Sequence, residues 1–301
     1  MRKWFTQIKF TLKDGLGFAG FWLVRALERV LPVAALYWLL WPVFQIQGFL
    51  NILFRRAPKY PLWPPALTVV PGFWERVRAK REHYFHHLLR MFPDRLSSPK
   101  WQVRCQIHGL APLAAAAAAK RPAILTFMHA GPFFIMHHWL RAQGLPVAGF
   151  FGDLSRKRRR FFRFRDRLGP LPQVPVALHL DELRETIQFV QGGGMLFISA
   201  DTPSDRLVTV PFDADWQVTL STGGWRLAAR HGAVCVPVWI TAVGPWRYQV
   251  GIGEPAPAKL LAAADGGAAG TAYLMAQLAP VLRAHPGQCG LKCAFQPRPS
   301  P

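Results

Sequence analysis

Acidic residues are scarce in this sequence of 301 residues. Sixteen Asp and Glu stand against 37 Lys and Arg, which gives a formal net charge of +21 at pH 7. An excess of this size requires an anionic partner or surface, and nucleic acid, anionic lipid and an acidic carrier protein all qualify. A disordered chain is excluded, because 51% of the residues are hydrophobic, with 12 Trp and 22 Phe.

Cysteine is also sparse, and its spacing matches no disulfide or metal-binding motif. The four cysteines are Cys105, Cys235, Cys289 and Cys293. They form no CxxC pair and no disulfide-like pattern, which excludes a disulfide-stapled scaffold and indicates a reducing compartment.

Metal-ligand patterns are missing as well. His83, His86 and His87 fall on one predicted helix, without a carboxylate or cysteine at useful spacing. We therefore expect a solvated or membrane-facing helix there rather than a metal site. No metal and no tightly held cofactor are predicted.

Charge is absent from Val30 to Phe54, where Leu, Trp, Phe and Val dominate. The run is long enough to cross a hydrocarbon core of ~30 Å, but its prolines and amides suit a tilted or in-plane anchor equally well. Basic residues that fit headgroup contacts flank it: Arg25, Arg29, Arg55, Arg56 and Lys59. We predict a membrane anchor over residues 1–57, with a buried hairpin of a soluble domain as the alternative. The run starts late and lacks a small-x-small cleavage site, so a cleaved signal peptide is not expected.

The remainder divides into two parts. Residues 58–120 are a proline-rich linker and a helical prelude, with a helix over Phe73–Met91; residues 121–301 alternate strands and helices. Strands are expected over Ala123–Met128, Pro146–Phe151, Val174–Leu178, Met195–Ala200, Leu207–Phe212, Ala233–Ile240 and, at an edge, Trp246–Ile252. Helices are expected over Phe133–Ala142, Ser155–Leu168, Asp181–Gln191, Val218–His231 and Thr271–Ala284. This order predicts an α/β domain with a mixed, largely parallel sheet flanked by helices.

Two polar residues directly follow predicted strands. His129 comes after Ala123–Met128 and at the entry of a helix, whose N-terminal amides favour developing negative charge. Asp201 comes after Met195–Ala200. In open α/β sheets ligands bind beyond the carboxyl ends of the strands. We therefore take His129 and Asp201 as candidate catalytic residues.

Four short blocks follow one another between Arg121 and Ile240. They are Ile124–Met128 with His129-Ala130-Gly131; Arg165 and Gly169; Asp201-Thr202 with Val210-Pro211-Phe212; and Thr222-Gly223, Leu227-Ala228 and Val234–Val238. In this order they resemble the late acyltransferases of bacterial lipid A biosynthesis, within the lysophospholipid acyltransferase group.

The resemblance implies an enzyme at the cytoplasmic face of the bacterial inner membrane. Its donor would be a fatty acyl thioester of acyl carrier protein or coenzyme A, and its acceptor a hydroxyl of a glycolipid or phospholipid. The candidate substrate-binding residues are Gly131, Arg159, Arg163, Arg165, Thr222 and Gly223.

One position departs from that family's pattern. The acid five residues after the histidine is Phe134 here, and residues 130–152 contain no Asp or Glu. In acyl transfer the imidazole removes the proton of the acceptor hydroxyl, and a carboxylate orients the ring; losing that carboxylate in a serine protease costs ~10⁴-fold. Three explanations remain open: a carboxylate from another loop (Asp153, Asp201 or Asp205), a backbone carbonyl that orients the ring, or a relative that binds lipid and has lost the chemistry.

A basic segment interleaved with phenylalanine lies between the predicted strands. It comprises Arg156-Lys157-Arg158-Arg159-Arg160, then Arg163, Arg165 and Arg167, with Phe161, Phe162 and Phe164 between them. A solvated helix face and a nucleic-acid patch are the alternatives, but no nucleic-acid-binding signature accompanies it. Beside an anchor, the segment suits anionic headgroups or acyl carrier protein, and its aromatics suit a bilayer boundary. The rival from a different class is a basic membrane-surface scaffold.

Overall fold

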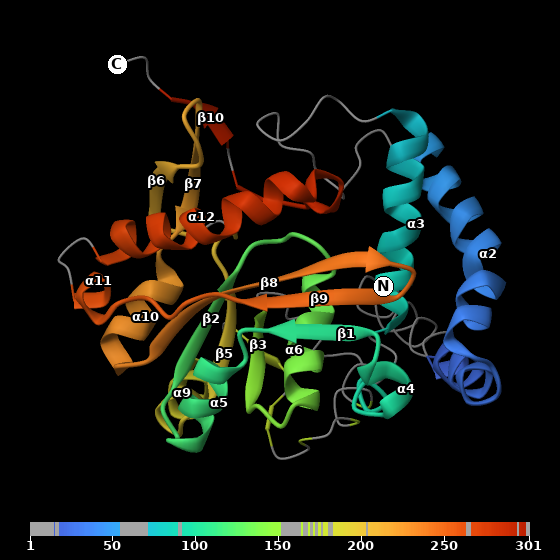
Figure 1. Ribbon diagram of the computed structural model, residues 1–301, viewed down its shortest axis with the longest axis horizontal. Helices are drawn as coiled ribbons and strands as arrows, with labels where there is room; N and C mark the ends of the chain where they lie inside the picture. The colour runs from blue at the N-terminus through green and yellow to red at the C-terminus, as the bar shows by residue number, and fades with distance from the viewer. Residues whose placement is uncertain are drawn as a thin grey trace, which may run out of the picture.

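A seven-stranded sheet forms the centre of the molecule in the computed structural model (Figure 1). The structure describes residues 15, 18–54, 72–89, 92–151, 164, 168, 171, 174–175, 177–179, 183–202, 204–262, 266–293 and 295–298. The strand order is β1-β9-β8-β2-β5-β3-β4. The strands are β1 (Cys105–His108), β2 (Ala123–Phe127), β3 (Val147–Phe151), β4 (Ala177–His179), β5 (Met195–Ser199), β8 (Val234–Gly244) and β9 (Arg247–Ile252). Neighbouring strands are parallel except β8 and β9, so the predicted mixed, largely parallel sheet is confirmed.

Helices cover both faces of this sheet, and for this reason all of β2 is buried. Leu125 and Phe127 face a core shared with α5 (Ala111–Ala118), α6 (Phe133–Ala142) and α3 (Phe73–Leu89). Ile124 and Met128 face the core shared with α9 (Leu183–Gln191), α10 (Gly223–His231) and α12 (Gly266–Ala284). Three short helices are α4 (Pro99–Gln102), α11 (Ala258–Ala262) and η1 (Pro286–Gln288). Alternation along the central strand therefore separates two apolar layers.

A second, antiparallel sheet corrects one prediction. It contains β6 (Leu207–Pro211), β7 (Trp216–Ser221) and β10 (Phe295–Pro297), in the order β10-β7-β6. The helix expected from Val218 is wrong, since Trp216–Ser221 is a strand and α10 begins at Gly223. In β7 the alternate residues Val218 and Leu220 are fully buried, which is the period of a strand rather than a helix.

The predicted edge strand is also misplaced. β9 lies inside the sheet, between β8 and the parallel strand β1, with Cys105 opposite Tyr248. β1 comes from the segment predicted to be a helical prelude, and its four residues are too short to show a periodic pattern.

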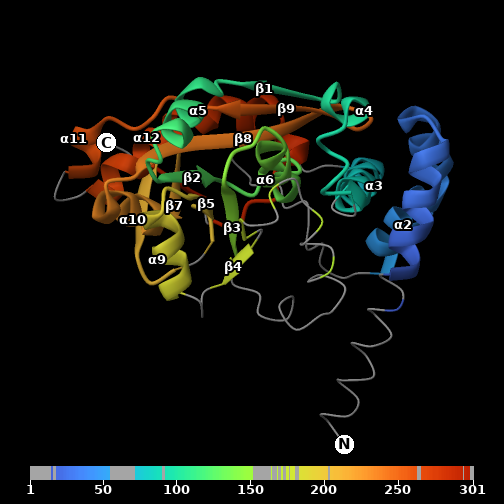
Figure 2. The same cartoon turned by 90° about the horizontal axis from the view of Figure 1, so that it is seen from below.

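Two apolar helices lie beside the domain near the N-terminus. Residues 18–30 are helical, and α2 (Val33–Phe54) packs along α3, which separates it from the sheet (Figures 1 and 2). Tyr37 stacks on Phe85 with ring centroids 4.1 Å apart, and its hydroxyl donates to Glu82 at 3.0 Å. The inner face of α2 is thus held by specific contacts with α3.

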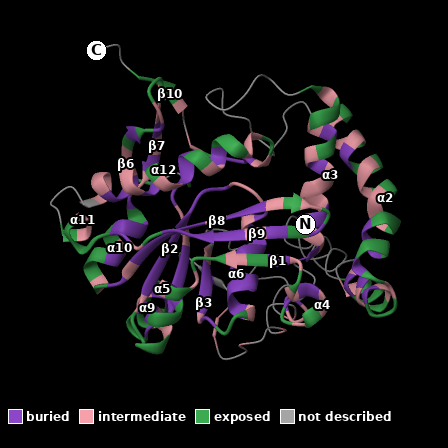
Figure 3. Ribbon diagram, in the orientation of Figure 1, coloured by how far each residue is buried: buried purple, intermediate pink, exposed green. Residues whose placement is uncertain are grey.

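The outer face of α2 is uncovered (Figure 3). Its large apolar side chains recur every three or four residues and are each at least 44% exposed: Leu39, Val43, Ile46, Leu50 and Leu53. We name these five residues the outer stripe. Among the described residues, α2 is the one helix long and apolar enough to cross a membrane.

A buried carboxylate joins the first helix to the domain. Glu28 is 1% exposed and accepts from Trp101 Nε1 at 3.0 Å, with Lys100 Nζ at 3.4 Å. Arg25 forms a bidentate ion pair with Asp94: Nη1 donates to Oδ1 at 2.7 Å and Nη2 to Oδ2 at 2.8 Å. The expectation that Arg25 contacts headgroups is therefore wrong, because its guanidinium pairs with Asp94 within the protein. Arg55, Arg56 and Lys59 lie outside the described residues.

Candidate active site

The strand register brings His129 and Asp201 together. β2 and β5 are parallel neighbours, with Phe127 opposite Ser199. His129 and Asp201 each follow two residues later, so both emerge at the same edge of the sheet. His129 Nδ1 lies 2.7 Å from Asp201 Oδ1. Both residues are buried, at 7% and 2% exposure.

The Asp201 carboxylate is held from several sides. The backbone N–H of His129 donates to its two oxygens at 3.2 and 3.1 Å, and the backbone N–H of Lys292 donates to Oδ2 at 3.0 Å. An ionised carboxylate only accepts hydrogen bonds, so His129 Nδ1 must carry the proton of the 2.7 Å contact. The Nε2 lone pair is then left to act as a base.

Aromatic rings surround the imidazole. Phe133 meets it edge-on at 4.4 Å, and Phe127 is tilted at 5.7 Å. The side chain of His129 is 8% exposed. The ring is therefore reachable only along a narrow remaining edge, in surroundings that exclude most water.

Phe134 packs elsewhere. It is buried and stacks on His87 of α3 at 4.2 Å, with His83 at 5.9 Å. His83 and His87 thus contact α6 and are half-buried, so on this face the helix expected to be solvated or membrane-facing packs against the domain. His86 is buried beside Tyr248, and that burial, with a smaller effect of His83, lowers the pKa of His86 to about 3. Among the described residues, no three His, Cys, Asp or Glu gather as metal ligands.

Gly131 lies against the neighbouring strand. Its φ is +61°, and a Cβ there would stand 1.9 Å from the carbonyl oxygen of Ile240. Its amide donates to the carbonyl of Gln288 at 2.8 Å. The glycine therefore permits close approach between the histidine segment and β8.

The other predicted site residues divide into two groups. Thr222 and Gly223 begin α10; the Thr222 amide donates to Arg206 at 3.1 Å and the Gly223 amide to Ser221 Oγ at 3.3 Å. Arg159, Arg163, Arg165 and Asp153 lie outside the described residues, whereas Asp205 is exposed before β6. Phe164 belongs to the basic segment, is half-buried and contacts Phe21 with ring centroids 5.5 Å apart.

No pattern in the sequence predicts the C-terminal segment that crosses the site. The amide of Gly290 donates to the carbonyl of His129 at 2.7 Å, and Ala130 and Cys289 form an antiparallel bridge. We call residues Gln288–Lys292 the strap. These contacts use backbone groups, which leave no residue-type pattern.

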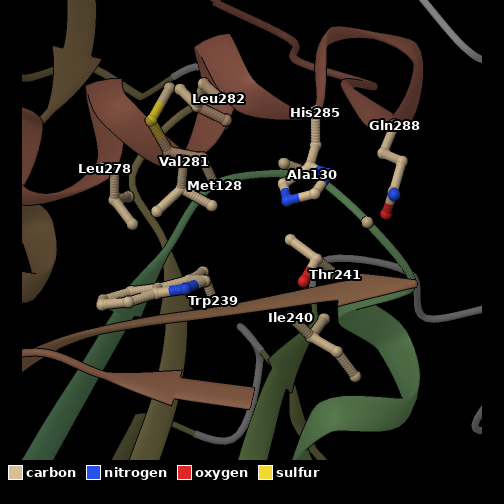
Figure 4. Close-up of a pocket in the computed structure, with 11 residues that line it drawn as sticks. Met128, Ala130, Trp239, Ile240, Thr241, Leu278, Val281, Leu282, His285 and Gln288 are labelled. Atoms are coloured by element: carbon tan, nitrogen blue, oxygen red, sulfur yellow. The ribbon is translucent and has the colours of Figure 1, made fainter. Parts of the chain in front are cut away.

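A hollow lies on the far side of the histidine segment (Figure 4). It lies between α12, β8 and the end of β2, is open in part to solvent, and has a cavity volume of about 10 Å³. Its lining is mostly apolar: Met128, Ala130, Trp239, Ile240, Leu278 and Leu282, with the polar Thr241, His285 and Gln288. His129 falls between Met128 and Ala130, and its ring packs with Phe127 in the opposite layer.

No protein-family model matches the sequence. No curated protein matches it either. Among solved structures, the chain is similar to the crystal structure of the 1-acyl-sn-glycerophosphate acyltransferase PlsC from Thermotoga maritima, with a TM-score of 0.41 and 12% identity over 92% of this chain and 96% of that one. A likeness at this level defines neither a family nor an activity.

Proposed function

We propose that the protein is an acyltransferase that moves a fatty acyl group from a thioester to a hydroxyl of a membrane lipid. The observation that supports it best is the buried His129–Asp201 pair at the carboxyl edge of the sheet, with a 2.7 Å contact between ring and carboxylate. That contact supplies the orienting acid that Phe134 cannot provide. The four blocks of family-like sequence add to this support.

The pair suits proton transfer during attack on a thioester. His129 Nε2 removes the proton of the acceptor hydroxyl as its oxygen bonds to the thioester carbonyl carbon. Asp201 accepts from Nδ1–H, and so stabilises the imidazolium that forms. When the tetrahedral intermediate collapses, the C–S bond breaks and the imidazolium returns its proton to the leaving thiolate. The products are an ester and a free thiol.

The membrane is the proposed location, with α2 in the plane of the interface. A spanning α2 would place α3 inside the hydrocarbon, because the two helices pack side by side. α3 carries Glu75, Arg78 and Arg81 among its charged residues, and charges at that depth are costly. An in-plane α2 instead submerges the outer stripe and leaves α3 above the lipid.

The finer assignments follow the resemblance. We propose a bacterial inner-membrane enzyme facing the cytoplasm, with acyl carrier protein or coenzyme A as the donor and a lipid A precursor or another glycolipid or phospholipid as the acceptor. The predicted anion-binding role of Arg159, Arg163 and Arg165, and the substrate contacts of Gly131, Thr222 and Gly223, belong to this proposal.

The test is acyl transfer from labelled donors to a total bacterial lipid extract. His129→Ala should abolish transfer while vesicle binding persists. His108→Ala is the matched control, because His108 is an exposed histidine on β1. Full transfer by His129→Ala would exclude His129 as the base.

A silent lipid-binding relative is the second candidate, and the 8% exposure of the His129 side chain favours it. The same assay separates the two. A wild-type protein that binds vesicles but transfers nothing from either donor would establish the silent relative.

A further inference from the structure

The strap contacts both members of the His129–Asp201 pair. Gly290 N–H donates to the His129 carbonyl at 2.7 Å, and Lys292 N–H donates to Asp201 Oδ2 at 3.0 Å. Because Oδ2 is held by this amide, Oδ1 stays turned toward the ring. The orientation of the acid is therefore set by the His129 N–H together with a segment far along the chain, since Lys292 lies 91 residues after Asp201.

Gln288 fixes the strap to the sheet. Its Nε2 donates to the Ala242 carbonyl and its Oε1 accepts from the Ala242 N–H, each at 2.8 Å. Its own carbonyl accepts from Gly131 N–H at 2.8 Å. Gln288 thus joins the strap to β8 through its side chain and to the histidine segment through its backbone carbonyl.

The histidine segment has a hollow on one of its sides. Met128, Ala130 and Gly131 border the hollow, and so does Gln288 (Figure 4). Side chains beside empty space lose dispersion contacts on that side. The backbone hydrogen bonds of the strap are consequently the specific restraints on this face of the segment.

We propose that Gln288 is a positioning residue for the acyl transfer. Through the strap it keeps Asp201 Oδ1 on His129 Nδ1 and so maintains the Nδ1–H tautomer that leaves Nε2 free as the base. This proposal rests on the proposed function for its kinetic consequence, but the tautomer itself can be observed without any substrate.

The test compares two glutamines that make the same kind of contact. Gln277 pairs with the backbone N–H and carbonyl of Glu254, at 2.9 and 3.4 Å, in α12 and away from the strap. In Gln288→Met we expect kcat to fall by roughly 10- to 100-fold, as a misplacement of about 1 Å can cost, with KM for the donor little changed. Gln277→Met should retain wild-type kcat, and the two variants should lose similar thermal stability.

Nitrogen-15 NMR of histidine-labelled protein provides the second measurement, with the His129 signals assigned from the His129→Ala spectrum. Gln288→Met should lose the single Nδ1–H form, and Gln277→Met should keep it. An unchanged tautomer and an unchanged kcat in Gln288→Met would overturn the proposal. If wild-type protein shows no transfer at all, the proposed function fails, and the tautomer comparison still decides whether Gln288 positions the pair. Should Gln288→Met fail to fold, Gln288→Glu takes its place, since it keeps the acceptor and removes the donor.

Discussion

Asp201→Asn is the substitution that most directly tests the orienting acid. Asparagine has the same size, and its Oδ1 can still accept from the amides of His129 and Lys292, which donate to the carboxylate at 3.0–3.2 Å. Its NH₂ group then faces His129 Nδ1. Because that group donates, Nδ1 must become the acceptor and the proton moves to Nε2. The ring is left in the tautomer that cannot take a proton from the acceptor hydroxyl.

The size of the effect follows from that tautomer. In serine proteases the corresponding change costs ~10⁴-fold in kcat, which equals about 5.5 kcal/mol of transition-state stabilisation. We expect a loss of roughly 10³- to 10⁴-fold here. Stability should fall by only about 1–3 kcal/mol, because one charge-assisted hydrogen bond is replaced and the remaining ones are kept.

The assay is kcat and KM for transfer from labelled acyl carrier protein and acyl coenzyme A, with urea unfolding beside it. Asp205→Asn is the control, because Asp205 is an exposed acid a few residues away. Retention of more than about a tenth of the wild-type kcat by Asp201→Asn would refute the reasoning, and so would an equal loss in both variants. We expect kcat to fall in Asp201→Asn without a comparable fall in the free energy of unfolding.

Three further outcomes are expected. Phe134→Glu should give no gain in rate, since Asp201 already holds the ring, and should lower stability by about 3 kcal/mol or more in urea unfolding, since it places a carboxylate against His87; faster transfer would contradict this. Replacing Val43 and Ile46 of the outer stripe by Glu should weaken co-sedimentation with anionic vesicles by more than about 10-fold, whereas unchanged binding at high salt would remove the in-plane anchor. The pKa of His86 is about 3 in the folded protein and ~6.5 when unfolded, so between these values the unfolded chain holds the extra proton and stability falls as the pH drops, by up to about 1.4 kcal/mol per unit. His86→Gln should flatten that slope in urea unfolding between pH 7 and 5, and an unchanged slope would assign the pH dependence to other groups.

Much of the central sheet could be predicted because its strands are apolar runs that end at polar residues. Ala123–Phe127 and Met195–Ser199 are both followed by such residues, and the sequence placed His129 and Asp201 at strand ends on this ground. Which strands are neighbours is a long-range property, and for this reason the sequence left open whether Asp153, Asp201 or Asp205 orients the ring. Only the register of β2 on β5 brings Asp201 to the ring.

The misses have local causes. Trp216–Ser221 alternates apolar and polar residues over only six positions, and the helix predicted from Val218 joined its second half to α10, which begins after Thr222. The strap was invisible because its contacts are backbone amides and one glutamine paired with the backbone of Ala242. A glutamine side chain that bonds to a distant backbone group leaves no characteristic residue spacing, and so the sequence does not reveal it.

The pairing of His129 with an acid 72 residues away has a consequence for biogenesis. An acid five positions along the same helix is in place as soon as one turn forms. Here the pair requires two completed strands and the docked strap, because Lys292 lies 91 residues after Asp201 and still contacts its carboxylate. A folding intermediate in which the strap has not yet docked therefore lacks the Gly290 and Lys292 hydrogen bonds that hold the pair. Completion of the pair waits on long-range folding, which a local motif does not require.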